Sequence, residues 1–312
     1  MKNPTLPQSR LKIKLAIISS ILSSLSFAIM LAISKVALTN CSLNQISFFK
    51  SFFSLLLTSV LIFFCKKNQS YFSYLKTKQI NIHAVRSLSG LATIYLFLFA
   101  LEKLSLAEAN LLFNTTPLFV PLIAYLWKRT PINHKIWPGL FIAFSGMIFL
   151  LHPQDTSLNS GIWIALLAGA IGAITIIAVR FSHGTEPICR SIFYYGIFSL
   201  FFSGIFYVIE GFSLAPLCQP SAVLALFGIG ASGFCCQVFF TLSVKYAPAK
   251  LIAPFAYVAV IFGLGLDLIF WQVNILLSEV FGMVLVLVGL YFVVSLFHRK
   301  DPELLEDSKL LD

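Results

Sequence analysis

The strongest constraint on this chain is an internal repeat whose copies each contain an odd number of apolar runs. The 312 residues contain ten such runs, five in each copy. Because every membrane crossing reverses the direction of the chain, five crossings leave the second copy inverted relative to the first. The sequence therefore predicts an all-α membrane protein with ten transmembrane helices arranged as two inverted five-helix repeats. The matching features are segment 104–107 with segment 246–249, Gly139 with Gly282, Gly146 with Gly289, and Lys35 with Arg180.

The composition indicates that lipid surrounds this protein. The chain is 58% apolar and 11% charged, with a mean hydropathy of +0.91. A water-soluble protein of this length could not bury so much apolar surface, whereas each crossing of a bilayer core needs about 20 mainly apolar residues. The predicted crossings are residues 15–36, 43–64, 81–101, 106–127, 135–151, 160–181, 188–209, 220–242, 250–270 and 277–297.

These runs divide the chain into four parts. A short segment, residues 1–14, precedes the first five-helix repeat, residues 15–151. The second repeat, residues 160–297, is followed by an acidic tail, residues 298–312. We expect the basic residues of the first segment to form a cytoplasmic anchor and the tail to be solvated, and the sequence shows no sign of an appended soluble domain.

The basic residues predict the orientation of the helices. All of the 22 lysines and arginines except Lys35, Lys50 and Lys103 lie in or beside the tails and alternate loops that share one side. The positive-inside rule makes that side cytoplasmic, so both termini are predicted to be inside the cell. The net charge of +10 is accordingly interpreted as a topology signal at the lipid surface and not as a nucleic-acid interface.

The sequence lacks the residues that several classes of function require. The six cysteines have no metal-ligand spacing, and no nucleophile–base pair or phosphate-binding glycine loop is present. The loops are also too short to hold an ATPase, so we predict no enzyme, no catalytic residue, no metal and no cofactor. Inverted repeats are typical of secondary transporters, which bind a small-molecule substrate near the midplane. A membrane-embedded enzyme and a channel are the less favoured alternatives.

Two charged residues inside apolar runs are candidate substrate contacts, because a charge in a membrane is costly unless it faces a partner or a cavity. Lys50 lies in the second run, where an anion contact competes with snorkelling or an interhelical hydrogen bond. Asp267 lies in the ninth run, where it could bind a substrate cation or a coupling proton. Its alternative role is a structural ion pair with Lys35.

Uncharged polar residues complete the predicted substrate site. Asn110 and Asn114 are one helical turn apart and offer both donors and acceptors. Gln237 and Tyr95 occupy matching positions in the two repeats, and Tyr257 follows a proline in the ninth run. Helix–helix hydrogen bonds are the alternative for the amides, and plain packing is the alternative for the aromatic rings.

Other basic side chains near helix ends receive mainly structural interpretations. His83 and Arg86 share one helix face, and we expect that face to contact lipid headgroups or a loop, with a substrate role for Arg86 as the alternative. Arg180 and its repeat counterpart Lys35 are expected to act as positional anchors, with a gating or substrate-site role as the alternative.

The order and duplication of several short motifs resemble EamA-type members of the drug/metabolite transporter superfamily. In the first repeat these are Arg86, the segment 100–109 and the segment 117–119, and in the second they are the segment 245–249 and the Gly282/Gly289 pair. Segments 46–53, 83–86 and 253–257 are most similar to S-adenosylmethionine uptake carriers of intracellular bacteria. The resemblance implies a bacterial inner-membrane carrier that takes up S-adenosylmethionine, with exchange for S-adenosylhomocysteine as one option. A carrier that imports or exports amino acids or other amphiphilic metabolites is the alternative.

Overall fold

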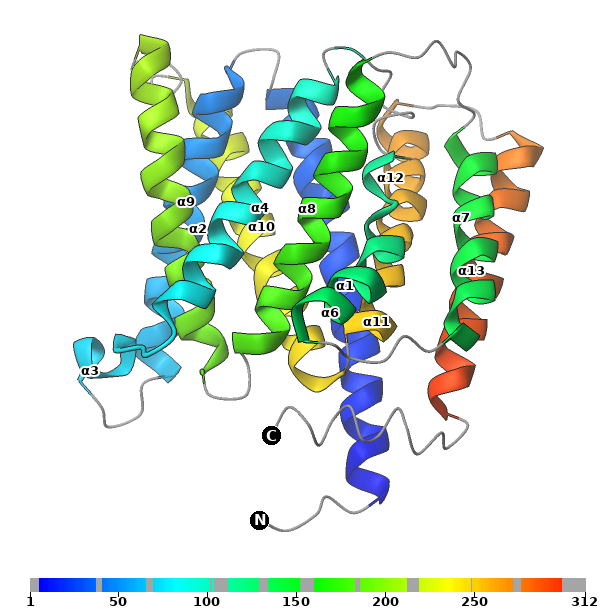
Figure 1. Ribbon diagram of the computed structural model, residues 1–312. Helices are drawn as coiled ribbons and strands as arrows, with labels where there is room; N and C mark the ends of the chain where they lie inside the picture. Colours follow the sequence, from blue (N-terminus) through cyan, green and yellow to red (C-terminus); the bar gives the residue numbers. More distant parts are fainter. Residues whose placement is uncertain are drawn as a thin grey trace.

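The computed structural model describes residues 6–37, 41–65, 70–101, 103, 112–128, 134–151, 160–182, 186–211, 219–247, 249–271 and 276–298 (Figure 1). These residues are almost entirely helical and contain no strand, as the sequence predicts. The elements of the first half are α1 (Leu6–Ala37), α2 (Leu43–Cys65), α3 (Tyr71–Leu75), α4 (Ile80–Leu101), α6 (Thr116–Lys128), η1 (His134–Ile136) and α7 (Trp137–Leu151). Those of the second half are α8 (Ser160–Ser182), α9 (Ile188–Gly211), α10 (Pro220–Tyr246), α11 (Ala249–Ile252), η3 (Ala253–Phe255), α12 (Ala256–Trp271) and α13 (Leu277–His298).

Six helical segments in the described part of the chain are long and apolar enough to cross a membrane. They are α1, α2, α8, α9, α10 and the continuous segment formed by η3 and α12. Two shorter apolar stretches lie in α6 and α13. Helices α4 and α7 overlap the predicted crossings 81–101 and 135–151, and part of the predicted crossing 106–127 lies outside the described residues.

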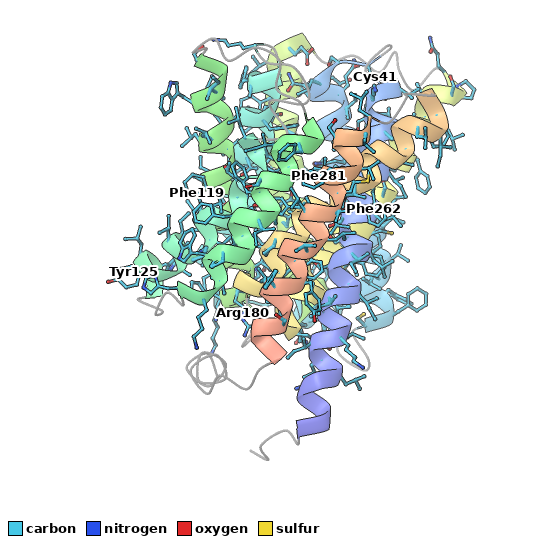
Figure 2. All side chains as sticks on the ribbon, turned by 90° about the vertical axis from the view of Figure 1, so that its right-hand side faces the viewer. Cys41, Phe119, Tyr125, Arg180, Phe262 and Phe281 are labelled. Atoms are coloured by element: carbon cyan, nitrogen blue, oxygen red, sulfur yellow. The ribbon has the colours of Figure 1, made fainter. Side chains whose placement is uncertain are left out.

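Side chains exposed on the outer surface of the bundle are largely apolar. Large hydrophobic residues such as Phe64, Leu126, Ile209 and Leu277 are exposed, and Figure 2 shows such side chains projecting along the length of the bundle. A water-soluble protein does not leave so many large apolar residues exposed along its helices. The surface therefore fits a surrounding of lipid.

Contacts between the helices are related by exchange of the two halves. The short helix α3 is left out of the counting here, so that α4 is the third and α7 the fifth helix of the first half. Helix α1 packs on α10 and α4 packs on α8; in each pair the first helix of one half meets the third of the other. The second helices of the halves, α2 and α9, pack on each other, and so do the fifth helices, α7 and α13. Helices α1 with α12 and α6 with α8 form another exchanged pair. This pattern is the one expected for two repeats related by an approximate twofold axis.

The contact between α7 and α13 depends on the glycines that the sequence marks as repeated. A Cβ atom added to Gly289 would lie 2.5 Å from the backbone nitrogen of Ala143 and 2.6 Å from the oxygen of Gly139. A Cβ atom on Gly146 would lie 2.7 Å from the oxygen of Gly282. Glycine therefore lets the two backbones touch, which is a common way for membrane helices to associate.

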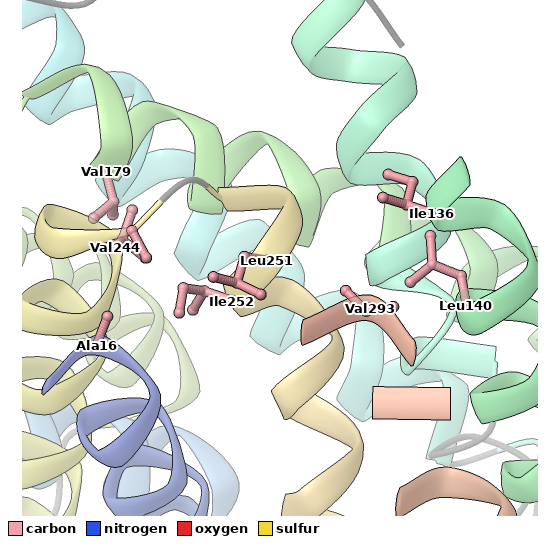
Figure 3. Close-up of a cluster of buried hydrophobic side chains, with 9 residues drawn as sticks. Ala16, Ile136, Leu140, Val179, Val244, Leu251, Ile252 and Val293 are labelled. Atoms are coloured by element: carbon pink, nitrogen blue, oxygen red, sulfur yellow. The ribbon is translucent and has the colours of Figure 1, made fainter. Parts of the chain in front are cut away.

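Helix α1 begins, and α13 ends, at the same end of the bundle (Figure 1). We call this the basic end, because the described residues Lys12, Lys14, Lys135, Arg190 and Lys245 belong to the helix ends that meet there. Buried apolar side chains from both halves pack near it, as Figure 3 shows. The cluster comprises Ala16, Ile136, Leu140, Val179, Val244, Ala247, Leu251, Ile252 and Val293.

At the basic end, Arg180 links α8 to the last turn of α10. Its Nη1 atom donates hydrogen bonds to the carbonyl oxygens of Val244 (2.9 Å) and Lys245 (3.0 Å). These carbonyls belong to the last turn of α10, where backbone acceptors have no partner within the helix and a positive charge is favourable. The geometry supports the anchoring role that the sequence predicts for Arg180.

Candidate functional site

The most unusual polar group in the described bundle is Arg86 of α4, which is 1% exposed. Its Nη1 atom donates to the hydroxyl of Ser191 in α9. Its Nη2 atom donates to Gln237 Oε1 and to Thr241 Oγ1 of α10, both at 3.0 Å. The guanidinium carbon also lies 5.3 Å from the ring centroid of Tyr195 in α9. Arg86 thus joins the third helix of the first half to the second and third helices of the second half.

The partners of this buried cation are electrically neutral. The acceptors are two hydroxyls and one amide. The Nε atom of Arg86 has no hydrogen-bond partner among the described residues. A buried charge without a counter-charge is costly, and in membrane proteins such residues mark functional sites more often than structural ones.

Helix α4 turns a polar stripe toward α9 and α8. His83, Ser87 and Thr93 are buried on this stripe together with Arg86. Gly90 lies between them, and a Cβ atom there would lie 3.0 Å from the ring of Tyr195. The missing side chain therefore gives Tyr195 room to lie against Arg86.

His83 lies on the same stripe, one turn closer to the basic end. Its ring stacks on that of Tyr194, with centroids 4.9 Å apart and planes inclined by 14°. Neither ring nitrogen has a hydrogen-bond partner among the described residues. The expectation that His83 and Arg86 contact headgroups or a loop is wrong, because both side chains are buried against α9.

Lys50 approaches the same helix, α10, from α2. A Cβ atom on Gly233 would lie 3.5 Å from Cγ and 3.7 Å from Cδ of Lys50, so the lysine stem packs over this glycine. Gly233 and Gln237 are one helical turn apart and share a face of α10. The structure therefore brings two of the predicted site residues, Lys50 and Gln237, to one face of α10, where Arg86 joins them.

Helix α1 supplies a second polar surface beside α10. The Ser23 hydroxyl donates to the carbonyl oxygen of Cys236 at 3.1 Å. The Ser24 hydroxyl donates to the carbonyl oxygen of Phe255 at 2.8 Å, at the short helix break between α11 and α12. Such side-chain donors satisfy backbone carbonyls where a membrane helix is interrupted.

Tyr95 lies apart from Gln237, its counterpart in the repeat. The Tyr95 hydroxyl donates to Asn44 Oδ1 at 3.2 Å, and its ring lies 4.8 Å from that of Phe206. Since Tyr95 follows Arg86 by nine residues, it lies about 13 Å farther along α4. The two matching positions therefore make different contacts in this structure.

Of the remaining predicted residues, the structure describes the side chains of Tyr257 and Asn114. Tyr257 is fully buried in an apolar cluster with Met147 and Val286, and its hydroxyl has no partner among the described residues. Asn114 is buried in the turn before α6. Asn110 lies outside the described residues, and Asp267 is placed in α12 by its backbone alone, since its side chain lies outside the described part. Their roles stay predictions.

Comparison with known proteins matches both halves of the chain to one family model. The model of the EamA-like transporter family matches residues 14–152 and again residues 159–295. The pseudopaline exporter CntI of Pseudomonas aeruginosa is 23% identical over 269 residues, which cover 83% of this chain and 89% of that protein.

Two other comparisons concern substrate and fold. An S-adenosylmethionine uptake transporter of Rickettsia felis is 23% identical over 218 residues, covering 70% of this chain and 71% of that protein. A solved crystal structure superposes with a TM-score of 0.72 over 92% of this chain and 98% of that chain, at 15% sequence identity. At this identity the superposition shows a shared fold alone.

Proposed function

Because the chain belongs to the EamA-like transporter family, we propose that it is a secondary transporter that moves a small polar metabolite across a bacterial inner membrane by alternating access. In this proposal ten helices cross the bilayer as two inverted repeats, residues 15–151 and 160–297, with the basic end on the cytoplasmic side. One observation carries it: the contacts between the halves are related by exchange of the halves.

The leading substrate is S-adenosylmethionine, with exchange for S-adenosylhomocysteine as a second step. The Rickettsia felis relative supports this choice. A carboxylate suits the cations Lys50 and Arg86 beside Gln237. We assign the sulfonium and ammonium charges to Asp267, because a carboxylate is the side chain that offsets a cation in a membrane.

The adenine ring requires a different set of groups. Asn110 and Asn114 offer the donors and acceptors that match a nucleobase edge, and we assign them to it. Tyr95 and Tyr257 are the aromatic candidates for contacts with the ring. Tyr95 packs against α2 and α9 and Tyr257 against α7 and α13, so one ring does not contact both in this conformation.

A carrier of amino acids or other amphiphilic metabolites is the second candidate. The specific observation in its favour is the similarity to an exporter, CntI, over 83% of this chain. This candidate uses the same cationic face of α10, but it needs neither a site for adenine nor uptake as the direction.

Uptake of radiolabelled S-adenosylmethionine by bacteria that express the protein tests the leading proposal. Cells with an empty vector serve as the control, and unlabelled S-adenosylmethionine, S-adenosylhomocysteine and amino acids serve as competitors. We expect label to accumulate inside the cells and the two adenosyl compounds to compete best. Competition by amino acids but not by the adenosyl compounds would favour the second candidate. Chemical alteration of the label by the purified protein in vesicles, where no other enzyme is present, would favour an enzyme.

A further inference from the structure

We propose that Arg86 binds the carboxylate of the transported molecule, and that the carboxylate takes the place of Gln237 on the guanidinium group. This inference rests on the proposed function, because it names the chemical group that the carrier's site recognises. It makes Arg86 the residue that distinguishes a substrate with a carboxylate from an analogue without one.

The first argument comes from the hydrogen-bond donors of Arg86. A guanidinium has five N–H donors in a rigid fork, and the Nε–H lies beside one Nη2–H in the geometry that holds a carboxylate by two parallel bonds. Nε has no partner among the described residues, whereas Nη2 donates to Gln237 and Thr241. A carboxylate that displaces the amide oxygen of Gln237 would receive both the Nε–H and the Nη2–H.

The second argument is the absence of a counter-charge in the contacts described for this side chain. Ser191, Gln237 and Thr241 offer neutral oxygens, and Tyr195 offers the face of a ring. The bond to the Gln237 amide already has a charged donor, whereas a carboxylate also supplies a charged acceptor, and the attraction between opposite charges is stronger out of water. A carboxylate therefore competes favourably with the amide for a cation that is already out of water.

The third argument is the second cation on the same face of α10. The Lys50 stem packs over Gly233, one turn from Gln237, so a molecule that displaces Gln237 from Arg86 also approaches the lysine side of this face. Gly230, a turn before Gly233, has no space for a side chain, since a Cβ atom would lie 2.4 Å from that of Phe53. The glycines thus keep α2, and with it Lys50, close to α10.

Displacement of the Gln237 amide by the substrate carboxylate changes the contact between the two halves. In the structure Arg86 of the first half is bonded to α9 and α10 of the second half. A substrate carboxylate that replaces Gln237 as acceptor removes one of the hydrogen bonds between Arg86 and α10. Binding therefore weakens a contact between the halves. Such a differential contact is what allows a ligand to shift a conformational equilibrium.

Binding of a matched pair of probes tests the inference. Purified protein in detergent is titrated with S-adenosylmethionine and with decarboxylated S-adenosylmethionine, which lacks only the carboxylate. The shift of the melting midpoint with ligand concentration yields an apparent Kd for each probe. The variant is Arg86→Gln, and Arg190→Gln is the matched control, because it removes a cation of α9 whose described bonds are to Glu186 and the Tyr74 carbonyl.

We expect the wild-type protein and Arg190→Gln to bind the acid at least about 10-fold more tightly than the decarboxylated probe, as the loss of hydrogen bonds to a charged group requires. Arg86→Gln should bring this ratio to within about 2-fold of one. If that variant does not fold, Arg86→Lys keeps the charge without the planar fork and should give an intermediate ratio. A wild-type ratio near one, or an unchanged ratio in the Arg86 variant, overturns the inference.

Failure of the proposed substrate gives a different result. If neither adenosyl probe binds the wild-type protein, S-adenosylmethionine is not the substrate. The ratio of the apparent Kd values with and without a carboxylate is then measured with methionine and methioninol. A preference for methionine that depends on Arg86 then supports the inference without the leading substrate. Absence of that preference, or of binding, overturns the inference as well.

Discussion

Substitution of Gly289 by alanine should push α7 and α13 apart. The added Cβ atom would lie 2.5 Å from the nitrogen and 2.7 Å from the Cβ atom of Ala143, and 2.6 Å from the Gly139 oxygen. The nearest atoms are mostly backbone, so a rotamer change cannot relieve the overlap. Overpacking of this kind costs about 1–3 kcal/mol, against which alanine gains up to about 1 kcal/mol as the better helix former. Because three atoms lie within 2.7 Å of the added Cβ atom, we place the cost at the upper end of that range, which leaves a net loss of about 2 kcal/mol.

Thermal unfolding of the purified protein in detergent measures this loss. Gly263→Ala and Gly265→Ala in α12 are the matched controls, because a Cβ atom at either position has nothing within 4 Å. The helix-propensity gain is the same in all three variants, so the difference between them reports the contact alone. We expect Gly289→Ala to melt several degrees below the wild-type protein, and the controls to melt at or above it. If Gly289→Ala melts no lower than the controls, the close contact between α7 and α13 is refuted.

Three further predictions concern single side chains. Arg180→Gln leaves two carbonyls at the end of α10 without their donor. The variant should therefore have a lower melting midpoint, corresponding to a loss of about 1–2 kcal/mol, and an unchanged KM for uptake. A raised KM would favour a role in gating. Tyr95→Phe removes one hydrogen bond to Asn44 and should cost about 1 kcal/mol in the same melting assay; a loss of adenosyl specificity in the competition assay would place the hydroxyl at the substrate. Asp267→Asn should lower uptake of a cationic substrate at normal expression, and unchanged uptake would remove this residue from the site.

The sequence predicts the helical architecture well because apolar runs of about 20 residues have few alternatives. It also marks the four glycines that let α7 and α13 approach, since each recurs at the matching place in the repeat. The repeat does not reveal that these glycines meet each other. That contact follows from the packing of the two fifth helices, which a sequence without coordinates does not specify.

Arg86 shows where prediction from the sequence failed. Its position near the start of a helix predicts a contact with headgroups or a loop. Position along the helix does not specify which neighbours that face meets, and in the structure Arg86 packs against α9 and α10. A signal was present: Arg86, Gly90 and Thr93 recur at helical spacing with His83 and Ser87, and a polar and small stripe on an apolar helix indicates a face turned to protein and not to lipid.

Symmetry between the repeats does not predict which candidates lie together. Tyr95 and Gln237 match in the repeat, yet the structure places one beside Asn44 and the other beside Arg86. Lys50, Arg86 and Gln237 come to one face of α10, and we propose that face as part of the site. A substrate without twofold symmetry needs an asymmetric site, so matching the repeats is not sufficient to find its residues.

Solute counterflow in proteoliposomes tests the central claim, that this protein is a carrier with alternating access, most directly. Vesicles are loaded with unlabelled S-adenosylmethionine, diluted into a trace of the labelled compound, and compared with vesicles that lack the protein. A carrier predicts a transient accumulation of label above equilibrium in loaded vesicles, and label that is chemically unchanged. Simple equilibration without an overshoot would indicate a channel and would contradict the account, as would no entry of label into vesicles loaded with either S-adenosylmethionine or amino acids.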